Sequence, residues 1–282
     1  MPPERRLAYE YRRQGGRPMK FLVQQQPAFV YTGGKPFDPS KPSVIFIHGA
    51  ANDHSVWTLQ ARYFAHHGWN AMAVDLPGHG KSFGDAKTSI AAYADWIINL
   101  LDNGAISKAA LVGHSMGSLI ALDCAARHGT RVSQIALLGT SAPMPVSDAL
   151  LDAARHRPTD AFDMLNIWGH APQMKWGKNP TPGTSSMMAY RRLLEQSLPG
   201  VLANDLAACQ VFVPDDTFFA DIRVPTLVVA GMRDMMTPAK SAQALAARLA
   251  DCDVAMLEET GHAMMQEAPG KSLDALRDFL KP

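Results

Sequence analysis

The sequence predicts an α/β protein, in which a mostly parallel sheet carries helices on both faces and a helical insertion separates two of its strands. Short apolar runs alternate with segments of helical period along the chain, and this alternation breaks once, near the middle. A serine between two glycines lies where one apolar run meets a helical segment. The runs are apolar throughout, which is typical of parallel strands buried on both faces.

Composition narrows the class of protein. A chain of 282 residues with 47% hydrophobic and 19% charged residues can form one large domain with an insertion. A net charge of +1 gives no reason to expect nucleic acid or a membrane surface as a partner. The three cysteines, Cys124, Cys209 and Cys252, have no short spacing and are expected to be buried thiols in a reducing compartment. The polar, arginine-rich residues 1–20 resemble no signal peptide, so we expect a cytoplasmic protein.

The expected strands and helices follow from these runs. The strands of the main sheet are expected at Ser43–Ile47, Ala71–Val74, Ala109–Val112, Ile135–Leu138, Thr226–Val229 and Val254–Leu257. Ahead of them, Phe21–Val23 and Ala28–Tyr31 are expected to pair antiparallel at the sheet edge. Helices between the strands are expected at Val56–His66, Ile90–Leu101, Met116–Arg127 and Ala239–Ala250. Thr237 is expected to cap the last of these, with Pro238 in its first turn.

Residues 142–220 contain no clear strand and are expected to form a helical cap, inserted between core segments 1–141 and 221–282. Helical patterns occur at Asp148–Arg157, Ala161–Trp168, Met187–Gln196 and Val201–Cys209. An insertion between two parallel strands lies at the carboxyl end of the sheet, where open α/β folds bind their ligands.

The segment Gly113-His114-Ser115-Met116-Gly117 follows a predicted strand and opens a predicted helix. This is the G-x-S-x-G pattern of a nucleophile elbow, a turn so tight that side chains at the glycine positions would collide with the neighbouring strand or helix. The hydroxyl of Ser115 is then exposed at the end of the sheet. The helix N-terminus directs partial positive charge to any anion that forms there.

A serine nucleophile needs a base, and the base needs a third group that orients it. Asp234 and His262 each follow a predicted strand, in the chain order serine, acid, histidine, so both are expected at the sheet edge that presents Ser115. Three other carboxylates remain as alternatives for the acid: Asp205, Asp215 and Asp216. His48 and His114 are expected to pack or to hydrogen-bond locally.

An oxyanion needs two backbone donors. One is expected from Met116, the residue after the serine, and the other from the loop that follows Gly49. Ala50 is the preferred second donor, but the sequence does not decide between Ala50 and Ala51.

Residues 75–82 (Asp-Leu-Pro-Gly-His-Gly-Lys-Ser) form a turn rather than a phosphate loop, because they lack its glycine spacing and its ending. Asp75 is expected to accept hydrogen bonds from nearby backbone. No group of ligand residues has metal-site spacing and no dinucleotide fingerprint occurs, so no cofactor is expected.

Taken in order, the segments 47–49, 75–82, 113–117, 231–234 and 261–262 resemble the α/β-hydrolase superfamily, in its capped, cofactor-free, esterase-like branch. The resemblance covers about residues 43–280 apart from the cap, and it implies an α/β-hydrolase fold. The sequence differs from two related branches of the superfamily. Cofactor-free haloperoxidases usually carry phenylalanine at the position of His114. Ring-cleaving C–C hydrolases usually carry asparagine there and glycine at the position of Ser118.

We therefore predict a serine hydrolase that cleaves a small, largely apolar ester or lactone through an acyl-enzyme. The pocket is expected to include Ala51, Trp168, Met174, Met187, Met235 and Met264. The alternatives are a C–C hydrolase, a haloperoxidase or perhydrolase, and a receptor of the same fold that turns its ligand over slowly or not at all. The oligomeric state is left open, with a homodimer among the options.

Overall fold

The computed structural model describes residues 21–177, 179–180 and 182–282, so the arginine-rich segment 1–20 lies outside the described residues. Its strands are β1 (Phe21–Val23), β2 (Gln26–Ala28), β3 (Val30–Tyr31), β4 (Ser43–Ile47), β5 (Asn70–Val74), β6 (Ala109–His114), β7 (Val132–Leu138), β8 (Thr226–Gly231) and β9 (Cys252–Leu257). Its α-helices are α2 (Thr58–His66), α3 (Ile90–Asn103), α4 (Met116–Arg127), α5 (Asp148–His156), α6 (Pro158–Trp168), α7 (Ser186–Glu195), α8 (Val201–Gln210), α9 (Asp216–Ala220), α10 (Ala239–Ala246), α11 (Met264–Glu267) and α12 (Pro269–Phe279).

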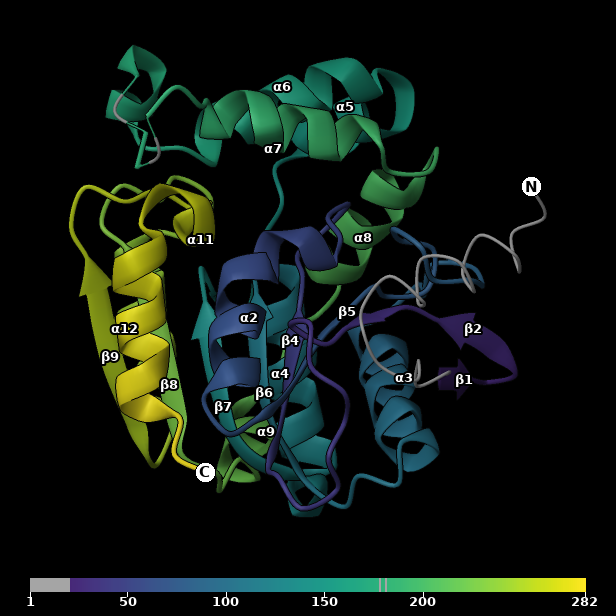
Figure 1. Cartoon of the computed structure of the whole chain (residues 1–282). Helices are drawn as coiled ribbons and strands as arrows, with labels where there is room; N and C mark the ends of the chain where they lie inside the picture. The colour runs from purple at the N-terminus through teal and green to yellow at the C-terminus, as the bar shows by residue number, and fades with distance from the viewer. Residues whose placement is uncertain (1–20, 178, 181) are drawn as a thin grey trace.

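The predicted α/β fold is confirmed. Within the described residues, β3 to β9 form a seven-stranded sheet in the order β3-β5-β4-β6-β7-β8-β9. Every pair of neighbours is parallel except β3 and β5, which are antiparallel. Helices α2 and α12 cover one face, and α3 and α4 cover the other (Figure 1).

Both faces of the central strands are buried, as the uniformly apolar runs predict. In β4, Ile45 and Ile47 pack into the core shared with α3 and α4, whereas Val44 and Phe46 pack into the core beneath α2. Alternate residues of one strand thus enter opposite cores, so the residues on both faces of the strand must be apolar. The result is a rigid sheet whose carboxyl edge carries the loops described below.

Two predictions about the sheet edges need correction. Phe21–Val23 pairs with Gln26–Ala28 in a separate two-stranded sheet, and only Val30–Tyr31 joins the edge of the main sheet. At the opposite edge β9 is only partly buried, and Val254 is 43% exposed. β9 is an edge strand of the sheet and has only one neighbouring strand. Solvent reaches residues there that would be buried in a central strand, even though the run is apolar.

Between β7 and β8 the chain forms α5 to α9, and four of these helices match the four predicted helical patterns. We call α5 to α8 (Asp148–Gln210) the helical segment. Helices α5, α6 and α7 lie across the carboxyl ends of the strands, and α8 descends from them toward the sheet (Figure 1). An apolar cluster within the segment includes Leu150, Leu165, Tyr190 and Leu206, and it also contains Ala51 of the loop after β4.

Among the described helices, none combines the length and the apolar character needed to cross a membrane.

Candidate active site

Ser115 lies in the tight turn between β6 and α4. Its φ of +52° is in the left-handed region, which residues with a side chain rarely occupy. The turn depends on close backbone approach at both glycines. A Cβ on Gly113 would lie 2.1 Å from the carbonyl oxygen of Gly117, and one on Gly117 would lie 2.3 Å from that of Ile47. A side chain at either glycine would therefore force the turn open.

Asp234 and His262 come together because they follow neighbouring parallel strands, β8 and β9. His262 Nδ1 lies 2.8 Å from Asp234 Oδ2, and both side chains are buried. Burial alone would raise the pKa of Asp234, but the facing His262 ring and the hydrogen bonds from His262 and Thr237 hold that pKa below its usual value. Asp234 is therefore an ionised partner for the ring.

Thr237 contacts both members of this pair. Its hydroxyl donates to Asp234 Oδ2 at 2.6 Å and lies 3.2 Å from His262 Nδ1. The backbone N–H groups of Met236 and Thr237 donate to the other carboxylate oxygen, each at 2.8 Å. The predicted capping role of Thr237 is wrong, since α10 has Pro238 at its N-cap and no side-chain cap. The threonine instead fixes the Asp234 carboxylate toward His262.

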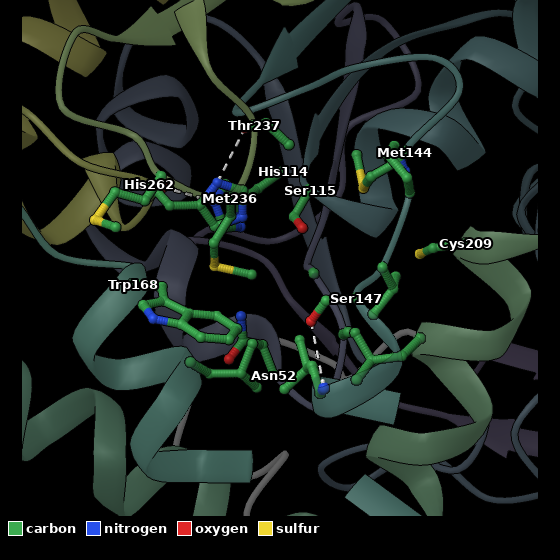
Figure 2. Close-up of a pocket in the computed structure, with 18 of the residues that line it drawn as sticks. Asn52, His114, Ser115, Met144, Ser147, Trp168, Cys209, Met236, Thr237 and His262 are labelled. Carbon is green, nitrogen blue, oxygen red and sulfur yellow. Dashed lines mark hydrogen bonds between the residues drawn. The ribbon is translucent and has the colours of Figure 1, made fainter. Parts of the chain in front are cut away.

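The second nitrogen of His262 is the one that faces the site. Nε2 is buried and has no hydrogen-bond partner among the described residues, and the ring lines the same cavity as Ser115 (Figure 2). His114 lies against this ring and donates from its own Nε2 to the His262 carbonyl at 2.9 Å. Burial and the neighbouring His262 lower the pKa of His114 to about 3. A neutral His114 thus supports the His262 loop.

The other carboxylates considered for the acid are occupied elsewhere. Asp205 pairs with His79, at 2.7 Å from its Nε2. Asp215 accepts the N–H of Phe218 at the start of α9, and Asp216 forms an ion pair with Arg248. None of the three hydrogen-bonds to His262 in the part of the chain that the structure describes.

Two backbone segments flank Ser115 as oxyanion donors would. Met116 is the first residue of α4, where helical N–H groups have no partner within the helix. Gly49 passes close to the elbow, because a Cβ there would lie 3.1 Å from Ser115 Cβ. Of the two residues that follow, Ala50 lines the cavity, whereas the Ala51 N–H donates to Asp205 Oδ2 at 3.0 Å.

The loop before Ala50 is held by His48, whose Nδ1 donates to the Gly49 carbonyl while its Nε2 accepts the N–H of Leu76. Burial and the neighbouring His79 lower the pKa of His48 to about 4, which keeps the ring neutral for these two bonds. His48 therefore acts locally, as the sequence predicts. Asp75 also behaves as expected, because it accepts the N–H groups of His54 and Lys81.

Ser115 and His262 both line a cavity of about 860 Å³, a volume that includes its mouth. The helical segment supplies one wall of this cavity and the sheet-end loops supply the other (Figure 2). Polar groups on its wall include Asn52, whose Oδ1 is buried and has no partner among the described residues. The lining residues are Gly49, Ala50, Asn52, His114, Ser115, Met144, Pro145, Val146, Ser147, Leu150, Leu165, Trp168, Tyr190, Leu206, Cys209, Met235, Met236, Thr237 and His262.

Of the residues predicted for the pocket, Trp168 and Met235 line this cavity. The others do not: Met264 packs into the core beneath α12, Met174 is buried outside the cavity, Met187 is half-buried at the start of α7, and Ala51 turns toward α8. Met144, Leu150 and Leu206 were missed, since their place depends on how the helical segment folds over the sheet. No short-range pattern reports that arrangement.

One group of potential metal ligands occurs among the described residues: Asp53, His54 and Asp75 bring ligand atoms within 4.8 Å of one another. These atoms are already used by the fold. Asp75 Oδ1 accepts from both the backbone and Nδ1 of His54, and Asp53 Oδ1 accepts the N–H of Ser55. The group is therefore a structural hydrogen-bond cluster.

A family model described as "Alpha/beta hydrolase family" matches residues 44–275. The chain is 26% identical over 264 residues to a pimeloyl-[acyl-carrier protein] methyl ester esterase of Aromatoleum aromaticum, a match that covers 86% of this chain and 99% of the relative. It is 25% identical to monoacylglycerol lipase abhd6-B of Xenopus laevis, over 98% of this chain and 86% of the relative.

Among solved structures, the enol-lactonase from Burkholderia xenovorans LB400 superposes with a TM-score of 0.81 at 20% identity, covering 93% of this chain and 99% of the other. At this identity the likeness concerns the fold alone. It agrees with a mostly parallel central sheet flanked by helices.

Proposed function

The chain belongs to the alpha/beta hydrolase family, and from that premise we propose that it is a serine hydrolase which cleaves a small, largely apolar carboxylic ester or lactone through an acyl-enzyme. One observation carries this proposal. His262 has Nδ1 bound to Asp234 and a buried Nε2 that is unpartnered among the described residues, and its side chain lines the cavity that Ser115 also lines. This is the arrangement a serine nucleophile requires of its base.

In the acylation step, His262 Nε2 takes the proton of the Ser115 hydroxyl as its oxygen attacks the substrate carbonyl. Asp234 holds the ring with Nδ1 protonated and stabilises the imidazolium that forms. The N–H groups of Ala50 and Met116 receive the negative charge on the carbonyl oxygen. His262 then gives its proton to the leaving alcohol, and the acyl group stays on Ser115.

In the deacylation step, His262 removes a proton from water, whose oxygen attacks the acyl carbonyl. His262 then returns that proton to the Ser115 oxygen as its bond to the acyl carbon breaks, which releases the acid and restores the serine. The helical segment acts as a cap that limits access to the cavity. Its residues Leu150, Leu165, Trp168 and Leu206 present apolar surface suited to an acyl chain or a ring. Names of relatives agree with this class of reaction, since they include a methyl ester esterase and a monoacylglycerol lipase.

The proposal is tested by hydrolysis of p-nitrophenyl esters from acetate to decanoate. We expect a serine-dependent burst, turnover that rises from acetate to hexanoate, and labelling of Ser115 by a fluorophosphonate. Ser115→Ala should lose both turnover and labelling. Ser118→Ala is the matched control and should keep both turnover and labelling. The Ser118 hydroxyl is fully buried, donates to the Ser115 carbonyl and contacts Thr140, so it is not available to attack a substrate.

Each part of the proposal can fail separately. A strict preference for acetate would contradict the apolar pocket and leave the nucleophile intact. Labelling without turnover of any ester would indicate a competent nucleophile beneath a selective cap. Neither labelling nor turnover by the folded wild-type protein would overturn the hydrolase and favour a binding protein.

A further inference from the structure

Asp205 of α8 is a buried carboxylate that the proposed reaction does not use. It accepts hydrogen bonds from the Ala51 N–H at 3.0 Å, from His79 Nε2 at 2.7 Å and from the Tyr93 hydroxyl at 2.9 Å. These donors come from the loops after β4 and β5 and from α3, far from Asp205 in sequence. One side chain of the helical segment therefore joins three parts of the sheet domain at the edge where Ser115 stands.

The residue that Asp205 contacts in the loop after β4, Ala51, is in an unfavourable conformation. Ala51 has a φ of +54°, which is unfavourable for a residue with a side chain and persists only when its surroundings hold it. The Asp205 carboxylate supplies such a hold, because it binds the N–H of Ala51 itself. Without it, the Ala51 N–H would lose its acceptor and the loop would lose a contact that opposes relaxation toward negative φ.

The direction of the neighbouring N–H follows from the same loop. The Gly49 carbonyl accepts from the Asn52 N–H at 3.2 Å and from His48 Nδ1 at 2.9 Å. Since C=O and N–H point in opposite directions across a trans peptide, the Ala50 N–H faces away from these donors. No hydrogen bond among the described residues uses the Ala50 N–H, and Ala50 lines the cavity beside Ser115.

We propose that Asp205 is a positioning residue for the oxyanion hole. By binding the Ala51 N–H it holds the loop in the shape that presents the Ala50 N–H to the reacting carbonyl, and it removes Ala51 as a donor. This inference rests on the proposed serine hydrolase function. It makes the last helix of the helical segment a part of the catalytic geometry as well as of the cavity wall.

His79 offsets the negative charge of Asp205 near the oxyanion hole. Its two nitrogens face two acceptors, Asp205 Oδ2 at 2.7 Å and the Pro77 carbonyl at 3.0 Å, so the ring holds a proton on each. A protonated His79 balances Asp205. The pair therefore adds little net charge next to the oxyanion that Ala50 and Met116 are to stabilise.

The test compares Asp205→Leu, Asp205→Asn and Tyr93→Phe in steady-state hydrolysis of the best p-nitrophenyl ester. Asp205→Leu removes the acceptor, so we expect kcat to fall about 10²-fold, as when one oxyanion donor is lost, with KM changed less than about threefold. Asp205→Asn keeps an amide oxygen for the Ala51 N–H and should restore kcat to within about tenfold of wild type. Tyr93→Phe removes another donor of the same carboxylate and should leave kcat near the wild-type value.

Two further readouts separate positioning from a loss of stability. A trifluoromethyl ketone, which forms an oxyanion on Ser115, should bind Asp205→Leu more weakly by the same factor as kcat/KM falls, while the product acid binds unchanged. Amide hydrogen exchange at Ala51 should quicken in Asp205→Leu and stay slow in Asp205→Asn. This exchange contrast requires no catalysis, so it tests the contact even if the wild-type protein cleaves no ester.

If Asp205→Leu does not fold, Asp205→Ser replaces it, because a serine hydroxyl is too short to reach Ala51 yet keeps the site polar. A folded Asp205→Leu or Asp205→Ser with wild-type kcat would overturn the proposal. A change confined to KM would also overturn it, since that would place Asp205 in substrate binding. Absence of labelling and turnover in the wild type would instead refute the hydrolase itself.

Discussion

The buried pairs Asp234–His262 and Asp205–His79 contain the same two residue types at nearly the same separation, 2.8 and 2.7 Å. They differ in what the second ring nitrogen meets. In His79 it faces the Pro77 carbonyl at 3.0 Å, whereas in His262 it has no partner among the described residues and faces the cavity. A histidine with acceptors at both nitrogens holds its proton, while one with a free nitrogen can exchange it.

The surroundings of the two pairs support this division of roles. Burial alone would lower the pKa of His79, but the charge of Asp205 and its hydrogen bond raise that pKa above its usual value. The Asp205–His79 pair fastens the helical segment to the sheet domain, and Asp234–His262 lies on loops of the sheet domain itself. A carboxylate beside a histidine therefore does not identify a catalytic pair until the second nitrogen has been accounted for.

The largest expected effect separates the two histidines. His262→Ala should lower kcat by about 10⁶-fold, the scale found when a serine hydrolase loses its base. His79→Gln should keep kcat within about tenfold of wild type, since the Asp205–Ala51 contact remains. It should cost up to about 3–5 kcal/mol of unfolding free energy, because a buried ion pair has lost one partner. Ester turnover and urea unfolding of both variants measure these effects.

The proposed difference in role between the two pairs would be contradicted if a folded His79→Gln lost as much turnover as His262→Ala. It would be contradicted equally if His262→Ala remained active and still reacted rapidly with the fluorophosphonate. In either case the free nitrogen would not be what distinguishes the two pairs.

The sequence predicts the sheet and its order of elements well because local patterns carry that information. The apolar runs correspond to β4 to β9, and the strand-end positions of Asp234 and His262 bring the two residues to 2.8 Å. The role of Asp205 had no such signal. The sequence leaves it as one of three alternative carboxylates for the acid, whereas the packing of α8 against the sheet domain sets it beside His79.

Two other discrepancies have the same cause. Thr237 looks like a helix cap because a proline follows it, but a nearby buried carboxylate competes for its hydroxyl. Met264 lies close in sequence to His262, yet the short helix that it begins turns it into the core. Proximity along the chain predicts the edge of the sheet on which a residue lies, and tertiary packing decides which way its side chain faces.

Removing the hydroxyl group that donates to each carboxylate should have an intermediate effect. Thr237→Val removes the donor to Asp234 Oδ2, and we expect kcat to fall about tenfold because a hydrogen bond to a charged group is worth roughly 1.5–3 kcal/mol. Tyr93→Phe removes the donor to Asp205 Oδ1 and should lower the unfolding free energy by a similar amount with kcat nearly unchanged. Parallel kcat and urea measurements test both. Equal losses of kcat in the two variants would remove the distinction between the supports.

The smallest expected effect is the dependence of stability on pH. The pKa of folded His79 is raised, so the Asp205–His79 pair contributes fully below the unfolded histidine value of about 6.5, and the contribution is lost as pH rises through the folded pKa. Burial would raise the pKa of Asp205, but His79 and the hydrogen bonds lower it, so the contribution is present above about pH 4 and is lost as pH falls through the folded value. The Tm gap between wild type and Asp205→Asn should therefore be widest between about pH 4 and 6.5 and narrow toward pH 9.

A change of about 1 kcal/mol shifts Tm by only about 2–4 °C in a chain of this size, so the gap is best followed by thermal unfolding at closely spaced pH values. The control is the same substitution in a His79→Gln background, where the gap should lose its dependence on pH because the titrating partner is gone. A gap that stays constant from pH 5 to about pH 9 in the wild-type background would show a His79 ring that is neutral in the folded protein. His79 would then be a hydrogen-bond donor of the same kind as His262, and only the free nitrogen of His262 would still separate the two pairs.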